Sequence, residues 1–250
     1  MLDLTPERPL PSPWALLKPA RFAFLSTLID KALALGYTLT GKDRYDDFRL
    51  ERVEGMPVVV TPSVFNPKSL RTGAFFAAHI DSRVVGGDAQ VLDMGTGSGV
   101  CALAAARFAR RVVAVDINSA AVRCAEMNAL LNHREQRIEV RHGDLFTPVR
   151  EERFDLILFN PPFLRGIPRD DRDRAWRSND VAERFAAGLG AHLNPGGFAL
   201  VLLSSFGAAR IFLDEFRRHG FALSVLAERR FINERLAIFR LQPPELRGAA

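Results

Sequence analysis

A short polar motif follows an apolar run near the middle of the chain. Asn160, Pro161, Pro162 and Phe163 come directly after residues 154–159. Consecutive prolines donate no backbone hydrogen bond and fix φ at about −65°, which leaves rigid carbonyl groups beside the asparagine amide oxygen. Two such acceptors can hold both hydrogens of an NH2 group while the phenylalanine ring stacks on its flat face. The motif predicts a site for a planar amide or amine, and a proline-stiffened loop is the structural alternative.

A glycine-rich segment forms the second chemical signal. Asp93, Gly95, Thr96, Gly97 and Gly99 lie between an apolar strand pattern and an alanine-rich helix pattern. The glycines allow positive φ and let a ligand lie against the backbone. The third glycine comes too early for a dinucleotide loop, and the lysine of a triphosphate loop is missing. This pattern favours a cofactor without a phosphate chain, with a simple tight turn as the alternative.

Two carboxylates are predicted to complete the cofactor site. Asp116 ends a short apolar strand about twenty residues after the glycines, where an acid can accept hydrogen bonds from ribose hydroxyls. Asp144 follows the strand expected over 137–141 and could accept from an adenine amino group. A solvated strand end or a helix cap is the alternative for either acid. Ile117 and Leu145, beside these acids, are further candidate contacts.

These motifs carry a resemblance over about residues 91–241. The pattern from Asp93 to Gly99 resembles motif I of class I S-adenosylmethionine-dependent methyltransferases, and residues 160–163 resemble motif IV of the amino-methyltransferases. The resemblance implies S-adenosylmethionine as cofactor. It also implies methyl transfer to a glutamine amide or to an exocyclic amine of adenine or guanine.

The downstream segments 176–185 and 228–236 look like those of the release-factor glutamine methyltransferase group. In that group a proline and threonine segment lies against the methionine end of the cofactor, which adds Thr72 to the candidate cofactor residues. The chain keeps Pro67 and Thr72 at a different spacing. Phe163 replaces the commoner tyrosine, as in several rRNA enzymes with the same motif.

Strand and helix patterns alternate from residue 91 onward. Such alternation predicts parallel strands with right-handed crossovers. Together with the resemblance it indicates an α/β fold: a class I methyltransferase, Rossmann-like sheet of seven mostly parallel strands closed by an antiparallel C-terminal hairpin. Strands are expected to end at 93 and to span 112–116, 137–141, 154–159, 198–203, 222–228 and 235–241; helices are expected over 100–109, 120–131, 181–192 and 208–219, with a turn at 194–197.

The N-terminal part is predicted to be a separate small region. A helix is expected over 19–36 and a hairpin over 48–61, which divides the chain into a region 1–62 and a methyltransferase domain 63–250. The small region could recognise substrate or could cover the sheet. The charged loop 164–180 could be a lid, a substrate loop or a solvated segment that pairs with itself; Trp176 favours a contact with substrate or core.

Composition limits the other possibilities. The 250 residues carry 34 Lys and Arg against 29 Asp and Glu, a net charge of +5 that permits a polyanionic partner without requiring one. No apolar run reaches the roughly 20 residues of a membrane span, and no secretion signal is seen in residues 1–13. Cys101 and Cys124 are expected to be buried thiols of a cytoplasmic protein. The histidines show no paired spacing, so no metal is expected.

The sequence leaves three functions open for this chain. A protein glutamine side chain is the first expected methyl acceptor, and an adenine or guanine base of RNA or DNA is the second. The third hypothesis is a binding module that keeps the cofactor pocket without catalysis. A macromolecular substrate is expected in the first two cases.

Overall fold

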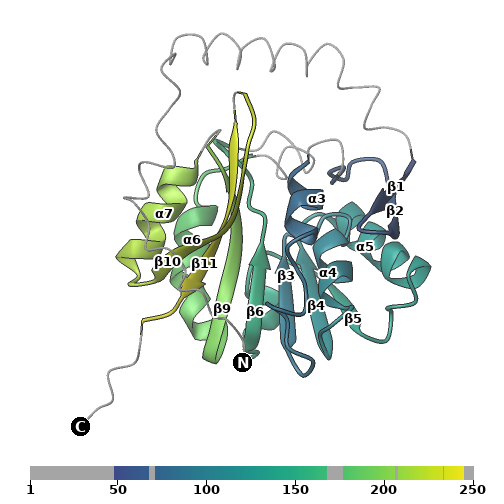
Figure 1. Cartoon of the computed structure of the whole chain (residues 1–250), viewed down its shortest axis with the longest axis horizontal. Coiled ribbons are helices and arrows are strands. Elements are labelled where there is room, and N and C mark those ends of the chain that lie inside the picture. Colours follow the sequence, from purple (N-terminus) through teal and green to yellow (C-terminus); the bar gives the residue numbers. More distant parts are fainter. Residues whose placement is uncertain (1–47, 68–70, 168–176, 206–207, 233, 245–250) are drawn as a thin grey trace.

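A seven-stranded sheet forms the centre of the molecule (Figure 1). This computed structural model describes residues 48–67, 71–167, 177–205, 208–232 and 234–244. The helix expected over 19–36 and the predicted contacts of Trp176 lie outside these residues. The strands run in the order β10-β11-β9-β6-β3-β4-β5.

The pairing of the strands confirms the expected fold class. β3 (Gln90–Met94), β4 (Arg111–Asp116), β5 (Ile138–His142), β6 (Phe154–Phe159) and the first part of β9 (Leu193–Ser204) pair in parallel. β11 (Arg235–Gln242) is antiparallel to both β9 and β10 (Ala222–Arg230). The carboxyl ends of the parallel strands therefore meet at one edge of the sheet, where ligands bind in open α/β folds.

Two helical layers cover the sheet because successive residues of each strand point to opposite faces. α3 (Thr72–Ala77), α4 (Val100–Ala105) and α5 (Ser119–Leu131) share one apolar core with Val112 and Ala114 of β4. α6 (Val181–Leu189) and α7 (Ala209–Arg218) share the other core with Val113 and Val115. The 3₁₀ helices are η1 (Thr147–Val149) and η3 (Gly190–His192), and the short strands are β7 (Leu164–Arg165) and β8 (Arg177–Ser178).

Some predicted boundaries were wrong. The helix expected to reach residue 109 ends at Ala105, and the turn expected at 194–197 lies inside β9. Gly196 has φ 79°, and a Cβ on Gly197 would lie 2.9 Å from the carbonyl oxygen of Phe154. The register between β6 and β9 shifts at this point. The glycines therefore form an irregularity within a strand, where two backbones approach closely.

The predicted N-terminal hairpin is confirmed as β1 (Arg49–Val53) and β2 (Met56–Val60). It packs on α5 through the buried amide of Asn128. The Oδ1 atom accepts from the backbone N–H of Val59 at 2.7 Å, and Nδ2 donates to the carbonyls of Val59 (2.7 Å) and Ser98 (2.9 Å). Val58 and Val60 are buried in the same core as α4, so the described part of the N-terminal region is continuous with the main body.

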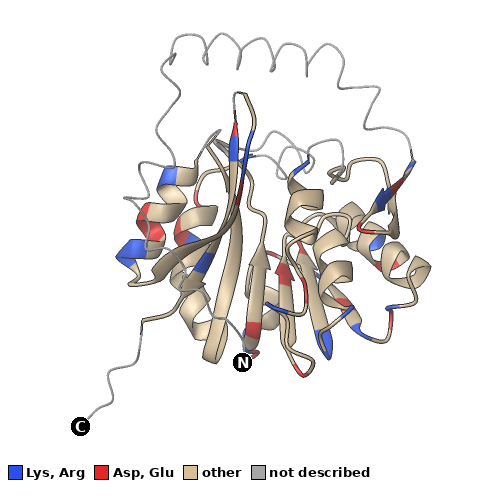
Figure 2. Cartoon of the chain, viewed as in Figure 1, with Lys and Arg blue, Asp and Glu red and all other residues tan. Residues whose placement is uncertain are grey.

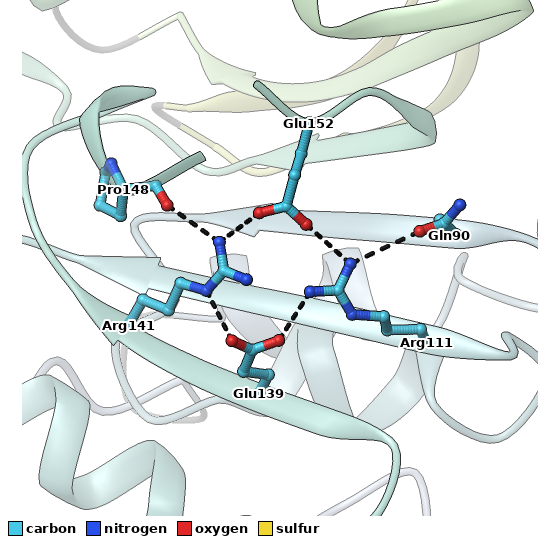
Figure 3. A network of polar contacts seen from close by, with 6 residues as sticks. All are labelled: Gln90, Arg111, Glu139, Arg141, Pro148 and Glu152. Atoms are coloured by element: carbon cyan, nitrogen blue, oxygen red, sulfur yellow. Dashed lines mark hydrogen bonds and ion pairs between the residues drawn. The ribbon is translucent and has the colours of Figure 1, made fainter. Parts of the chain in front are cut away.

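Charged residues are found mainly in the helices, in the β10–β11 hairpin and near strand ends, whereas the middle of the sheet holds few (Figure 2). Figure 3 shows one network in which Glu139 and Glu152 bridge Arg111 of β4 and Arg141 of β5. Glu139 accepts from Arg111 at 2.6 Å and from Arg141 at 2.8 Å, and these two hydrogen bonds lower the pKa of Glu139 to about 2. The network links the two strands at the edge of the sheet.

Candidate active site

A cavity of about 400 Å³ lies at the carboxyl ends of the parallel strands. Its volume is within the usual range for small-molecule sites. The structure brings twelve of the fourteen predicted site residues to its wall: Asp93, Gly95, Thr96, Gly97, Asp116, Ile117, Asp144, Leu145, Asn160, Pro161, Pro162 and Phe163. The predicted residues that do not line it are Thr72 and Gly99.

The glycines have positive φ, as the sequence predicted: 64° at Gly95, 56° at Gly97 and 78° at Gly99. Their surroundings differ. A Cβ on Gly97 would meet no atom within 4 Å, whereas a Cβ on Gly99 would lie 3.1 Å from the Cβ of Ala125 on α5. Gly97 therefore leaves open space at the cavity wall. Gly99 instead allows α4 and α5 to pack closely.

Asp93 holds the glycine loop against α4. Its buried Oδ2 atom accepts from the hydroxyl of Thr96 at 2.6 Å and from the backbone N–H of Ala102 at 2.9 Å. The second bond satisfies a donor in the first turn of α4, which has no partner within the helix. Burial raises the pKa of Asp93 to about 7. The Asp93 carboxyl group thus fixes the shape of the loop.

Asp116 connects the end of β4 to the same loop. Its Oδ2 atom accepts from the N–H of Gly97 at 2.8 Å, and its Oδ1 atom accepts from the N–H of Asn118 at 2.8 Å. Burial raises the pKa of this carboxyl group. A carboxylate has about four acceptor positions, so both oxygens keep capacity for a ligand hydroxyl. Ile117 is 37% exposed and offers an apolar surface at the cavity.

Asp144 is paired with Arg184, which no sequence motif indicated as a site residue. Arg184 of α6 donates from Nη2 to the Oδ2 atom of Asp144 at 2.5 Å, and both side chains line the cavity. Leu145 follows with φ 45°, an uncommon conformation for a residue with a Cβ. No local sequence signal connects Asp144 with an arginine that lies on a different element.

Asn160 presents an unpaired acceptor at the end of β6. Its Oδ1 atom is buried and has no hydrogen-bond partner among the described residues, yet the side chain lines the cavity. A buried polar atom without a partner costs about 1–3 kcal/mol. The carbonyl of Phe163 accepts from the N–H of Ala208 at 2.8 Å, which ties the motif to the start of α7. The amide oxygen can therefore accept a hydrogen bond from a ligand that enters the cavity.

The segment before α3 contributes residues that lie outside the predicted site set. Phe65, Pro67 and Gly73 line the cavity, whereas Thr72 is buried and does not line it; its hydroxyl has no hydrogen-bond partner within the described ranges. A Cβ on Gly73 would lie 2.7 Å from the Cβ of Pro67. The spacing of Pro67 and Gly73 was visible in the sequence, but their close contact depends on the fold.

The segment Arg177–Val181 also lines the cavity, at the end of the charged loop.

In the described part of the chain, no group of three or more His, Cys, Asp or Glu side chains is placed to hold a metal ion. The described helices are all too short or too polar to cross a membrane.

The chain is similar in sequence to known methyltransferases. The family model for the methyltransferase small domain matches residues 55–225. The chain is 30% identical over 209 residues to a release factor glutamine methyltransferase of Koribacter versatilis, covering 72% of each protein. It is 32% identical over 146 residues to the ribosomal RNA small subunit methyltransferase C of Alcanivorax borkumensis, covering 58% of this chain and 42% of that one.

A solved structure shares the fold. The 16S rRNA N2 G1207 methyltransferase of T. thermophilus, in complex with AdoMet and guanosine, superposes with a TM-score of 0.59 at 23% identity over 79% of this chain and 50% of that chain. The chain spans less than half the length of some curated relatives that it matches. The match over residues 55–225 shows that the chain belongs to the methyltransferase small domain family.

Proposed function

We propose that this chain is an S-adenosylmethionine-dependent N-methyltransferase that acts on a planar NH2 group, with a protein glutamine side chain as the leading acceptor. The observation that carries the proposal is the Oδ1 atom of Asn160, which is buried in the wall of the cavity and has no partner among the residues that the structure describes. An acceptor held without a partner suits a substrate that brings an N–H donor. The open face of Gly97 and the acceptors of Asp116 suit the amino acid and nucleoside of the cofactor.

When bound, S-adenosylmethionine would supply an electrophilic methyl group on a sulfonium. The acceptor nitrogen would bond to the methyl carbon as the C–S bond breaks and the neutral thioether leaves. Asn160 Oδ1 and the carbonyl of Pro161 would accept from the two N–H bonds of the acceptor. This orients the nitrogen lone pair toward the methyl group and stabilises the positive charge that develops on nitrogen. A proton then leaves the nitrogen to solvent. Positioning of this kind can supply about 7–11 kcal/mol of the barrier, and fixed dipoles add to it.

Glutamine is placed first because of the extent of the similarity. The release factor relative matches 72% of this chain, against 58% for the rRNA relative. A ribosomal protein uL3 glutamine methyltransferase of Bradyrhizobium diazoefficiens also matches 65% of the chain. A macromolecular substrate and a cytoplasmic location are part of this proposal.

An RNA base is the second candidate acceptor, favoured by a cluster of three side chains at the tip of the β10–β11 hairpin. The guanidinium groups of Arg71 and Arg229 lie 5.1 Å and 5.3 Å from the centroid of the Phe231 ring. Neither guanidinium has a carboxylate partner among the described residues, and Gly73, close to Arg71 in the chain, lines the cavity. Arginines held on an aromatic ring beside a site suit phosphates and stacked bases.

Radiolabelled cofactor distinguishes these acceptors. The protein is incubated with a methyl-labelled cofactor and a cell extract, and the labelled product is treated separately with protease and with nuclease. Loss of the label to protease, with glutamine as the modified residue after hydrolysis, is the expected result. Loss to nuclease would make RNA or DNA the acceptor, and no transfer above that of Asn160→Ala would contradict the proposed activity.

A further inference from the structure

Arg184 lies at the end of the cavity where Asp144 is predicted to contact adenine, although the proposed cofactor contacts do not include Arg184. Its Nη2 atom donates to Oδ2 of Asp144 at 2.5 Å, and its Nη1 atom lies 3.7 Å from Oδ1 of Asp180. The side chains of Arg184 and Asp144 are 43% and 41% exposed. All three residues line the cavity. The ion pair therefore joins the turn after β5 to the segment at the start of α6.

Asp144 depends on such a contact for a defined orientation. Its backbone lies in the turn after β5, directly before Leu145, whose φ is 45°. A half-exposed carboxylate in a turn can adopt several rotamers, and the side chain loses conformational entropy when it is held in one of them. The planar fork of arginine fixes the direction of a carboxylate better than a point charge does. Because Arg184 contacts Oδ2, the other oxygen, Oδ1, can face a ligand.

We infer that Arg184 is a positioning residue for the cofactor: through Asp144 it directs an acceptor at the 6-amino group of adenine and so sets the preference for adenine over other purines. This inference rests on the proposed function, because it requires the adenine ring to lie beside Ile117 and Leu145. It assigns to α6 a role in cofactor recognition. Through its contact with Asp180, Arg184 also connects the start of α6 with this end of the cavity.

The test measures the binding of two ligands and does not depend on catalytic activity. The first is S-adenosylhomocysteine, and the second is its analogue with hydrogen in place of the 6-amino group. Their dissociation constants are measured by calorimetry for the wild type, Arg184→Gln, Arg184→Lys and Asp144→Asn. The matched control is Arg83→Gln, because Arg83 makes the same Nη2 to Oδ2 contact with Asp81 at 2.5 Å outside the cavity.

We expect the wild type to prefer the adenine ligand about tenfold, the size of a hydrogen bond to a charged group. Arg184→Gln should reduce this preference to about threefold or less by weakening the adenine ligand alone. Arg184→Lys should recover part of it, and Arg83→Gln should leave it unchanged. Equal weakening of both ligands by Arg184→Gln, or no weakening, would overturn the inference.

The Asp144 variant separates this inference from the proposed function. If Asp144→Asn removes the preference while Arg184→Gln keeps it, the adenine site stands and the role of Arg184 fails. If neither ligand binds the wild type, the proposed cofactor site itself is wrong, and the role of Arg184 is overturned with it.

Discussion

The two halves of the cavity differ in whether their buried polar atoms have hydrogen-bond partners within the described part of the protein. In the half proposed to bind the cofactor, Asp93 accepts from Thr96 and Ala102, and Asp116 accepts from Gly97 and Asn118. In the half proposed to bind the methyl acceptor, the Oδ1 atom of Asn160 is buried and has no partner in the described part of the chain. The carboxyl groups of the first half are thus held by the protein itself, whereas the amide oxygen of the second lacks a donor among the described residues.

This difference in hydrogen bonding predicts that one half contributes to cofactor affinity and the other to the rate of methyl transfer. The engaged carboxyl groups fix the glycine loop in one shape, so a cofactor meets a formed surface and little ordering is required. The unpaired amide oxygen gains its hydrogen bond when an N–H donor arrives, and this bond strengthens as positive charge develops on the nitrogen. An interaction that is stronger in the transition state raises turnover rather than affinity.

Replacement of Asn160 should give the largest effect. Asn160→Ala removes the side-chain acceptor, and we expect kcat to fall at least about a hundredfold while the cofactor dissociation constant changes less than about twofold. Single-turnover rates and calorimetry measure the two quantities. A comparable loss of both would mean that Asn160 supports the fold of the whole cavity, and the contrast between the halves would disappear.

Replacement of Asp116 should give the opposite pattern. Asp116→Ala removes two backbone contacts and the ribose acceptors, so cofactor affinity should weaken by roughly 30-fold, in line with hydrogen bonds to a charged group. At saturating cofactor the turnover number should stay within about threefold of the wild type. Thermal unfolding controls for loss of the loop. An unchanged dissociation constant would remove Asp116 from the cofactor site.

The two glycines separate cofactor contact from packing. Both Gly97→Ala and Gly99→Ala introduce a left-handed residue at a cost of about 1–2 kcal/mol. Gly99→Ala also crowds Ala125, so its free energy of unfolding should fall further, while the affinity of the remaining folded protein is kept. Gly97→Ala should weaken cofactor binding. Calorimetry combined with denaturant unfolding would show whether the two variants instead behave alike.

The smallest effect on stability is expected for Glu139→Gln, in the ion-pair network at the edge of the sheet. Arg111 and Arg141 lower the pKa of Glu139, whereas burial raises that of Asp116. A lowered pKa means that Glu139 stabilises the fold above its unfolded pKa near 4.5 and that this contribution is lost as pH falls toward about 2. Because the Glu139 side chain is half exposed, Glu139→Gln should cost less than about 1 kcal/mol at pH 7.

Urea unfolding at several pH values measures this difference. The gap in the free energy of unfolding between wild type and Glu139→Gln should narrow below about pH 4.5 and should shrink in high salt. A gap that widens at acidic pH would have the wrong sign for a carboxylate stabilised by arginines.

Much of the architecture was determined by the sequence alone. The alternation of apolar strands and helices predicted the sheet and its closing hairpin, because side-chain periodicity reflects which face is buried. The motifs at 93–99 and 160–163 placed two parts of the cavity wall, since the carboxyl ends of parallel strands converge. The prediction of a turn at 194–197 was wrong because glycine and proline occur both in turns and at irregularities within strands.

The tertiary structure decided the contacts between distant segments. That Gly97 faces the cavity while Gly99 faces Ala125 depends on how α5 packs, and both glycines look alike in the sequence. The pairing of Arg184 with Asp144 joins α6 to the turn after β5, so no local pattern records it. Sequence periodicity reports local conformation and burial, whereas the partner of a polar atom is set by the packing of elements far apart in the chain.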